Sequence, residues 1–172
     1  MNLSIQEGKM SDFADRIPAV LQTISVESSS EIYEQNRHRI YSLAFWMTDN
    51  ELAAEELMTR TFCRAFAGTD APSAEAIDCA LISELRQYMP VGKLTLTCEP
   101  CARVLSVRRN ALRVDLERAV VQLPNTEKLI FLMHDVESYD HARIARLLGI
   151  TEVDSLNGLH QARLRMRELL AK

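Results

Sequence analysis

The feature that most constrains this chain is the helical period of its apolar residues. Between positions 51 and 66 they recur every three or four residues, along one face of an amphipathic helix. That face consists of Ala54, Leu57, Met58, Thr61, Phe62, Ala65 and Phe66. Only five Gly and five Pro occur in 172 residues, too few for the many turns of an all-β sandwich. With 47% hydrophobic and 26% charged residues, the chain can bury a core, and we expect an all-α fold.

Turn and cap signals predict two small helical domains. Ser28 to Ser30 mark a boundary, because Ser28 and Glu31 have the spacing of a helix capping box. The stretch Pro90 to Pro100 breaks the helical pattern and predicts a linker. We expect an N-terminal arm (1–30), a helical domain (31–89), a linker (90–102) and a second helical domain (103–172). The helices expected after residue 30 cover about 31–47, 51–66, 73–88, 103–122, 126–134, 140–148 and 154–171.

The last two expected helices form a helix-turn-helix pattern. Only Gly149 to Val153 separate them, and Asp154 can cap the second helix. In such a unit the second helix lies in the DNA major groove, with its N-terminal residues on base edges. Basic residues farther along it, Arg163, Arg165 and Arg167, can contact phosphates. A helical hairpin with a solvated basic end fits the same periodicity. The periodicity therefore favours neither the DNA-binding unit nor the plain hairpin.

Two sets of short motifs lie in a fixed order along the chain. In the C-terminal half they are Leu123-Pro124, Glu127, Phe131-Leu132, Asp135-Val136-Glu137, Ile144-Ala145, Leu147-Leu148-Gly149-Ile150 and Leu159-His160-x-Ala162-Arg163. In the N-terminal half they are Ile32-Tyr33, Arg37, Arg39-Ile40-Tyr41, Leu43-Ala44, Ala54-Glu55-Glu56-Leu57, Phe62 and Ala65-Phe66. The first set resembles region 4, and the second resembles region 2, of the extracytoplasmic-function sigma factors of bacterial RNA polymerase. The resemblance covers about residues 31 to 170.

The resemblance implies a two-domain, all-helical protein that binds core RNA polymerase and promoter DNA. Region 2 of such proteins docks on the polymerase and engages the −10 element, and region 4 contacts the −35 element. By position, the residues implied in polymerase docking are Asp49, Glu55, Glu56, Leu57, Phe62 and Arg64. Those implied in DNA binding are Ser155, Asn157, His160, Arg163, Arg165 and Arg167. Because family members are often held by an anti-sigma factor, we expect such a partner by resemblance alone.

The chain departs from the family pattern at four instructive positions. Thr59 and Arg60 replace the Gln and Glu that are usual in the docking motif. Leu156 and Gly158 stand where Lys and Arg are common in the DNA-reading helix. These departures put standard polymerase affinity and DNA binding in question.

Composition and motifs exclude several other classes of protein. The net charge is −4, so a uniformly basic nucleic-acid coat is ruled out, although residues 160–172 carry four basic residues and one acidic residue. We find no catalytic motif and expect no enzyme activity, no cofactor and no metal. Cys98-x-x-Cys101 has metal or redox spacing, but two reduced thiols in a linker are the simpler interpretation. With neither a signal-peptide core nor a bilayer-length apolar run, we expect a cytoplasmic protein that does not insert into membranes.

Three functions remain open at this stage. The first is a sigma-like initiation factor that binds polymerase and promoter DNA. The second is a diverged sigma-like regulator that acts mainly through protein contacts, with weak DNA binding. The third is a dimeric helix-turn-helix repressor with an unrelated N-terminal domain.

Overall fold

The structure is a computed structural model that describes residues 16–96 and 112–171, with only the backbone described for 16–27. These residues form seven α-helices and one π-helical turn, and no strand occurs among them. The helices are α2 (Arg16–Thr48), α3 (Glu51–Phe66), α4 (Ala74–Tyr88), α5 (Arg113–Val121), α6 (Asn125–Phe131), α7 (His141–Leu148) and α8 (Glu152–Leu170), with the π-helical turn η1 (Leu132–Val136) after α6. The prediction of an all-α fold is confirmed. The predicted stretch 103–111 and the Cys98-Cys101 pair lie outside the described residues.

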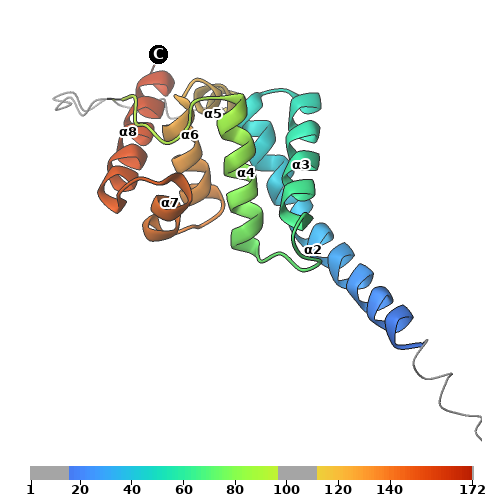
Figure 1. Cartoon of the computed structure of the whole chain (residues 1–172). Coiled ribbons are helices and arrows are strands. Elements are labelled where there is room, and N and C mark those ends of the chain that lie inside the picture. The colour runs from blue at the N-terminus through green and yellow to red at the C-terminus, as the bar shows by residue number, and fades with distance from the viewer. Residues whose placement is uncertain (1–15, 97–111, 172) are drawn as a thin grey trace, which may run out of the picture.

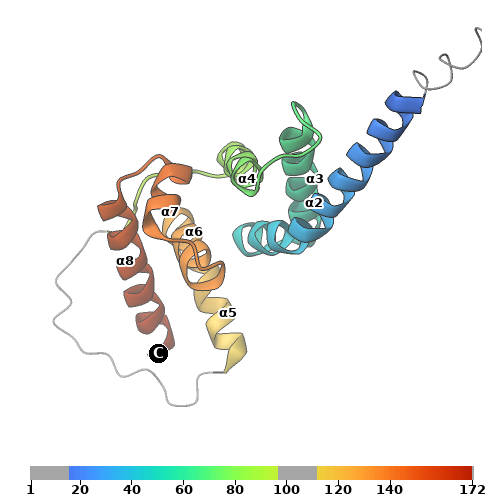
Figure 2. The ribbon, with the colours of Figure 1, turned by 90° about the horizontal axis from the view of Figure 1, so that it is seen from below.

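The N-terminal domain consists of α2, α3 and α4. Helix α2 is 33 residues long and runs without interruption through Ser28 to Ser30. The predicted helix start near Glu31 is therefore wrong. Serine costs a helix only a few tenths of a kcal/mol and no Gly or Pro stands nearby, so nothing stops the helix there. The N-terminal part of α2 extends away from the other helices (Figures 1 and 2).

Helices α3 and α4 begin at side-chain caps that the sequence supplies. Asn50 Oδ1 accepts the Ala53 N–H at 2.9 Å, and Ser73 Oγ accepts the Ala76 N–H at 3.1 Å. Asp49 turns the chain between α2 and α3 with a φ of 52°, a left-handed conformation that Asp tolerates better than most residues. The bounds predicted for α3 agree with the structure.

The C-terminal domain consists of α5 to α8 with η1. Asp140 caps α7 by accepting the Arg143 N–H at 2.7 Å, and Gly149 ends α7 with a φ of 67°. Helix α8 begins two residues earlier than predicted. Thr151, not Asp154, is its cap, and Asp154 completes a capping box by accepting the Thr151 N–H.

The two domains lie against each other, with α4 between them. Figures 1 and 2 both show α4 flanked by α2 and α3 on one side and by α6 to α8 on the other. The buried apolar residues of both domains belong to one contiguous cluster. Its largest fully buried members are Ile40, Leu43, Ile77, Leu81, Ile82, Leu85, Leu129, Ile130, Leu132, Met133, Ile144 and Leu148.

The first part of the predicted linker is fixed to the C-terminal domain. The Gly92 N–H donates to Thr126 Oγ1 at 3.1 Å. The Thr95 and Leu96 N–H groups both donate to Glu127 Oε1 at 2.6 Å, and Glu127 is fully buried. These bonds hold residues 92–96 against α6. The predicted domain boundaries stay predictions.

Candidate functional site

Helix α3 presents a row of exposed side chains on the face opposite its core stripe. Leu52, Glu55, Glu56, Thr59 and Cys63 are all exposed, and Leu52 has 75% of its surface accessible. They lie three or four residues apart, so they form one continuous strip along the helix. The strip combines one large apolar side chain with two carboxylates, a composition suited to binding another protein.

The residues predicted to dock polymerase divide into two sets. Asp49, Glu55 and Glu56 are exposed and available for contact. Leu57 and Phe62 are only 3% and 5% exposed, so they belong to the core that supports the strip.

Arg64 is exposed as well, but its guanidinium pairs with Glu84 of α4. Glu84 is 3% exposed and accepts Arg64 Nε at 2.5 Å and Arg60 Nε at 2.9 Å. Burial alone would raise the pKa of the Glu84 carboxyl, but the hydrogen bonds and positive charges of Arg64 and Arg60 outweigh it and lower that pKa. The cation at position 60 thus has a structural role within the domain.

The tip of α8 exposes two of the residues predicted to bind DNA and two apolar side chains beside them. Asn157 and His160 are exposed, together with Val153 (63%) and Leu156 (52%). Ser155, predicted to contact DNA, is fully buried, and its hydroxyl lies 2.9 Å from His141 Nδ1. Ser155 therefore has to be corrected from a DNA contact to a packing residue between α7 and α8.

Gly158 also faces inward. A Cβ at this position would stand 2.6 Å from Ile130 Cδ1 and 2.8 Å from Leu94 Cδ2. Gly158 is therefore a close-packing position that brings α8 against α6 and the start of the linker, and not a lost DNA contact.

Two of the three predicted phosphate-binding arginines already have acidic partners. Arg163 binds Asp135 through two bonds, Nη2 to Oδ1 at 2.6 Å and Nε to Oδ2 at 3.1 Å. Arg165 Nη1 donates to Glu168 Oε2 at 2.9 Å. Arg167 is exposed. Any DNA contact by Arg163 has to compete with a bidentate pair inside the protein.

Comparison with known proteins gives three findings. A family model described as sigma-70, region 4, matches residues 113–166. The ECF RNA polymerase sigma factor SigE of Mycolicibacterium smegmatis is 24% identical in an alignment of 163 residues, and the match covers 86% of this chain and 63% of that relative. The chain thus spans just under two thirds of the length of that relative. The fold is similar to the sigma factor RpoE from Bartonella quintana, solved in complex with the anti-sigma factor NepR, with a TM-score of 0.60, 15% identity, and coverage of 82% of this chain and 95% of that one.

The C-terminal domain matches sigma-70 region 4, and the chain as a whole is similar to extracytoplasmic-function sigma factors. The region 4 model covers α5 to α7 and most of α8. The fold similarity covers 82% of the chain, so it extends beyond the C-terminal domain. The predicted resemblance to these sigma factors and the two-domain helical architecture are confirmed.

Sequence analysis missed a histidine pair near α8. His134 and His141 stack with ring centroids 4.7 Å apart, and His134 Nδ1 lies 2.8 Å from Asp135 Oδ1. Burial, followed by the nearby His134 and Arg163, lowers the pKa of His141. Neither histidine stands in a recognised motif, and only the fold brings them together.

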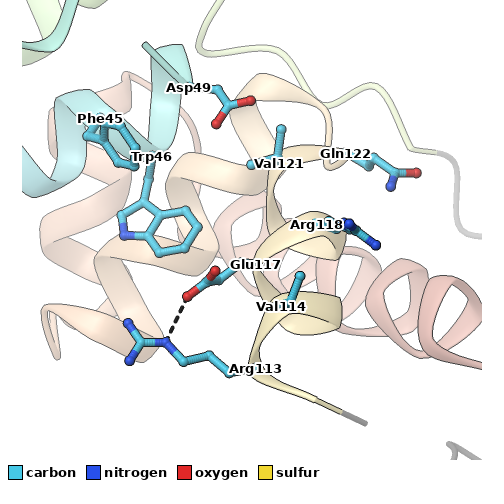
Figure 3. Close-up of a pocket in the computed structure, with 9 residues that line it drawn as sticks. All are labelled: Phe45, Trp46, Asp49, Arg113, Val114, Glu117, Arg118, Val121 and Gln122. Carbon is cyan, nitrogen blue, oxygen red and sulfur yellow. Dashed lines mark hydrogen bonds and ion pairs between the residues drawn. The ribbon is translucent and has the colours of Figure 1, made fainter. Parts of the chain in front are cut away.

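A cavity of about 470 Å³ lies between the end of α2 and α5 (Figure 3). It is lined by Phe45, Trp46, Asp49, Arg113, Val114, Glu117, Arg118, Val121 and Gln122. The Trp46 ring is turned toward Glu117 and Val114 of α5 (Figure 3), so Trp46 lines the junction between the domains.

The described ranges contain neither a membrane-spanning helix nor a cluster suited to a metal ion. No helix in them has both the length and the apolar character needed to cross a bilayer. Among the same residues, no group of three or more His, Cys, Asp or Glu is arranged to hold a metal ion.

Proposed function

We propose that this chain is a transcription initiation factor that binds core RNA polymerase through α3 and promoter DNA through α4 and α8. One observation carries the proposal. In the two stretches that resemble the polymerase-docking and −35-reading segments, separate helix faces are exposed, and they bear Leu52, Glu55 and Glu56 on α3 and Asn157 and His160 on α8. On this proposal the protein works in the cytoplasm and has no catalytic step of its own.

Polymerase docking uses the exposed strip of α3. Leu52 supplies an apolar anchor, and Glu55 and Glu56 supply charge that steers association with a basic partner surface. Arg60 and Arg64 are held by Glu84, so their charge is partly neutralised within the domain.

Promoter binding uses the tip of α8 for the −35 element and α4 for the −10 element. Asn157 is suited to adenine, and His160 can donate to a base or a phosphate. The exposed Val153 and Leu156 provide apolar contacts of the kind that meet a thymine methyl group.

The same two apolar residues favour a second candidate function. A tip that exposes Val153 and Leu156 beside the acidic Glu152 is less basic than most DNA-reading helices. This composition supports a regulator that acts mainly through protein contacts. A helix-turn-helix repressor with an unrelated N-terminal domain is disfavoured, because the fold similarity to a sigma factor extends over 82% of the chain.

We further infer that an anti-sigma factor binds this chain. The similar RpoE structure was solved in complex with such a partner, NepR. The exposed surfaces of α3 and α8 are the ones that such a partner would have to cover to prevent initiation.

The test combines polymerase binding with core-dependent transcription, using the full chain. Leu52→Asp should weaken binding to purified core polymerase by about tenfold or more, since it puts a charge at an interface anchor. Leu112→Asp is the matched control, because Leu112 is also exposed (66%) but lies at the start of α5, and it should leave binding unchanged. Equal effects of the two substitutions would contradict docking through α3.

A second arm separates the two candidate functions. Asn157→Ala should reduce binding to promoter DNA while leaving polymerase binding intact, and Thr59→Ala, an exposed polar residue of α3, should leave DNA binding unchanged. If the wild-type chain binds core polymerase but shows no sequence-specific, salt-sensitive DNA binding, the second function replaces the first.

A further inference from the structure

A buried carboxylate lies at the contact between the two domains. Asp78 of α4 is 1% exposed. Arg39 of α2 pairs with its Oδ1. Its Oδ2 accepts the Tyr139 hydroxyl at 2.9 Å and Arg143 Nη2 at 2.6 Å. We call these four residues the Asp78 cluster.

The C-terminal domain supplies two of the three partners of Asp78. Tyr139 precedes α7 and is 8% exposed, and Arg143 lies within α7. The Arg143 guanidinium also lies over the Tyr139 ring, with 3.7 Å from Cζ to the ring centroid. Separation of the domains would leave Asp78 with Arg39 and water. In the closed arrangement the carboxylate stays buried, so loss of one cross-domain partner there would leave a poorly compensated charge and favour opening.

Further contacts between α4 and the C-terminal domain reinforce the cluster. Arg86 Nη2, in the last turn of α4, donates to the Leu148 carbonyl oxygen at 2.6 Å. This bond satisfies a carbonyl at the C-terminal end of α7, where a positive charge is favoured. Glu75, in the first turn of α4, pairs with Arg146 Nε at 3.6 Å. Helix α4 therefore contacts the α7 segment from its first turn to its last.

The closed arrangement affects the surfaces of the N-terminal domain unequally. On α4, Asp78, Ile82 and Leu85 are buried. On α3, the strip from Leu52 to Cys63 stays exposed. Under the function proposed above, the α7-facing side of the helix that engages the −10 element is covered, although Cys79, Gln87 and Tyr88 of that helix stay exposed, and the polymerase-docking strip is free.

We propose that the Asp78 cluster holds the protein in a closed resting state, in which the C-terminal domain covers α4. Polymerase can dock on α3 in this state, but engagement of the −10 element requires α7 to leave α4. The link to the −10 element rests on the proposed function. The closed state and the cluster that holds it do not, and they can be tested without polymerase.

The test measures closure by cross-linking in the full chain. Glu75→Cys and Arg146→Cys are introduced together after Cys63, Cys79, Cys98 and Cys101 are changed to Ser, and a short bis-maleimide joins the two new thiols across the domain contact. Three further variants are compared in this background. Arg143→Gln removes the cross-domain charge, and Arg143→Lys keeps it. Arg113→Gln is the matched control, because among the described residues Arg113 pairs only with Glu117 on its own helix.

We expect Arg143→Gln to lower the rate of cross-linking by about tenfold, because one cross-domain partner of a buried charge is lost. Arg143→Lys should restore part of the rate, and Arg113→Gln should not change it. The Arg39 pair remains in all three variants, and we expect circular dichroism to show unchanged helix content. If Arg143→Gln cross-links as fast as its parent, the Asp78 cluster does not hold the closed state.

A transcription arm tests the functional consequence with wild-type cysteines. Arg143→Gln should raise core-dependent transcription several-fold with unchanged affinity for core polymerase. Suppose that the wild type is active and that Arg143→Gln lowers the cross-linking rate. If this variant then leaves transcription unchanged, the closed state is not a resting state. If even the wild type gives no core-dependent transcription, the proposed function fails, and the cross-linking rates still decide whether the cluster closes the domains.

Discussion

The Arg60 guanidinium donates to the buried Glu84 carboxylate at 2.9 Å and joins α3 to α4. Arg60 stands where the docking motif of the family usually has Glu, so the sequence alone suggests impaired docking. The structure gives the substitution a different meaning. Together with Arg64, Arg60 neutralises a carboxylate that is 3% exposed, and it thereby stabilises the packing of the two helices.

Restoring the usual family residue should therefore damage this protein. Arg60→Glu would place a second carboxylate beside Glu84, and we expect a loss of about 2 kcal/mol in the free energy of unfolding. The loss is moderated because Arg64 still pairs and Arg60 is half exposed. Urea unfolding measures it, with Arg113→Glu as a control on an exposed pair. A variant as stable as wild type would contradict the assigned role of Arg60.

Gly158 should tolerate no side chain at wild-type stability. Its Cβ would meet Ile130 and Leu94 at 2.6 and 2.8 Å, and overpacking costs about 1–3 kcal/mol against a helix-propensity gain of about 1 kcal/mol. We expect Gly158→Ala to lower the unfolding free energy by about 1 kcal/mol and the melting temperature by about 3 °C.

Gly68→Ala is the matched control for that substitution. A Cβ on Gly68 would meet nothing within 4 Å. The unfolding free energy of the Gly68→Ala variant should therefore be unchanged or slightly raised. A Gly158→Ala variant that melts above wild type would show that α8 and the linker can move apart at little cost.

The helix-turn-helix segment illustrates how much of the fold the sequence predicts. Gly149 adopts the left-handed conformation that its position at the end of a helix suggests, and Asp140 caps α7. The α3 bounds follow from a clean apolar stripe and from Asn50 before it. In each case residues close together in the sequence determine the outcome, so local rules suffice.

The polar residues between elements could not be assigned in the same way. Asp78 lies 39, 61 and 65 residues from Arg39, Tyr139 and Arg143, and no local pattern joins them. Ser155 and Gly158 were interpreted by helix position alone, but the packing of α6, α7 and the linker turns them inward. Glu127 matches a family motif, yet its bonds to the linker N–H groups appear only in the structure.

The histidine pair should make stability depend on pH. Burial and the neighbouring His134 and Arg163 hold the pKa of His141 below its ordinary 6.5 in the folded protein. The unfolded state therefore binds more protons near that pH. Stability from this site is present above about pH 6.5 and is lost as the pH falls toward the lower folded pKa.

We expect the melting temperature to fall between pH 6.5 and 5 in the wild type, and to fall less in His141→Gln. His160→Gln removes an exposed imidazole from the same helix pair and serves as the control. If His141→Gln and wild type show the same dependence on pH, the stacked pair does not couple protonation to folding.

Because Asp135 binds Arg163, we expect removal of the Asp135 charge to raise DNA affinity. Asp135 binds Arg163 through two bonds at 2.6 and 3.1 Å, which draws the guanidinium away from any phosphate. Asp135→Asn should free Arg163 and, under the proposed function, add about one phosphate contact. The slope of log affinity against log salt should then become steeper by about 0.9. Asp115→Asn removes the same charge from the exposed surface of α5, and we expect it to raise affinity slightly through net charge alone. A freed Arg163 that contacts a phosphate would release a counterion from the DNA, whereas the charge change at Asp115 would not. Equal slopes for the two variants would therefore show that Arg163 does not reach the DNA.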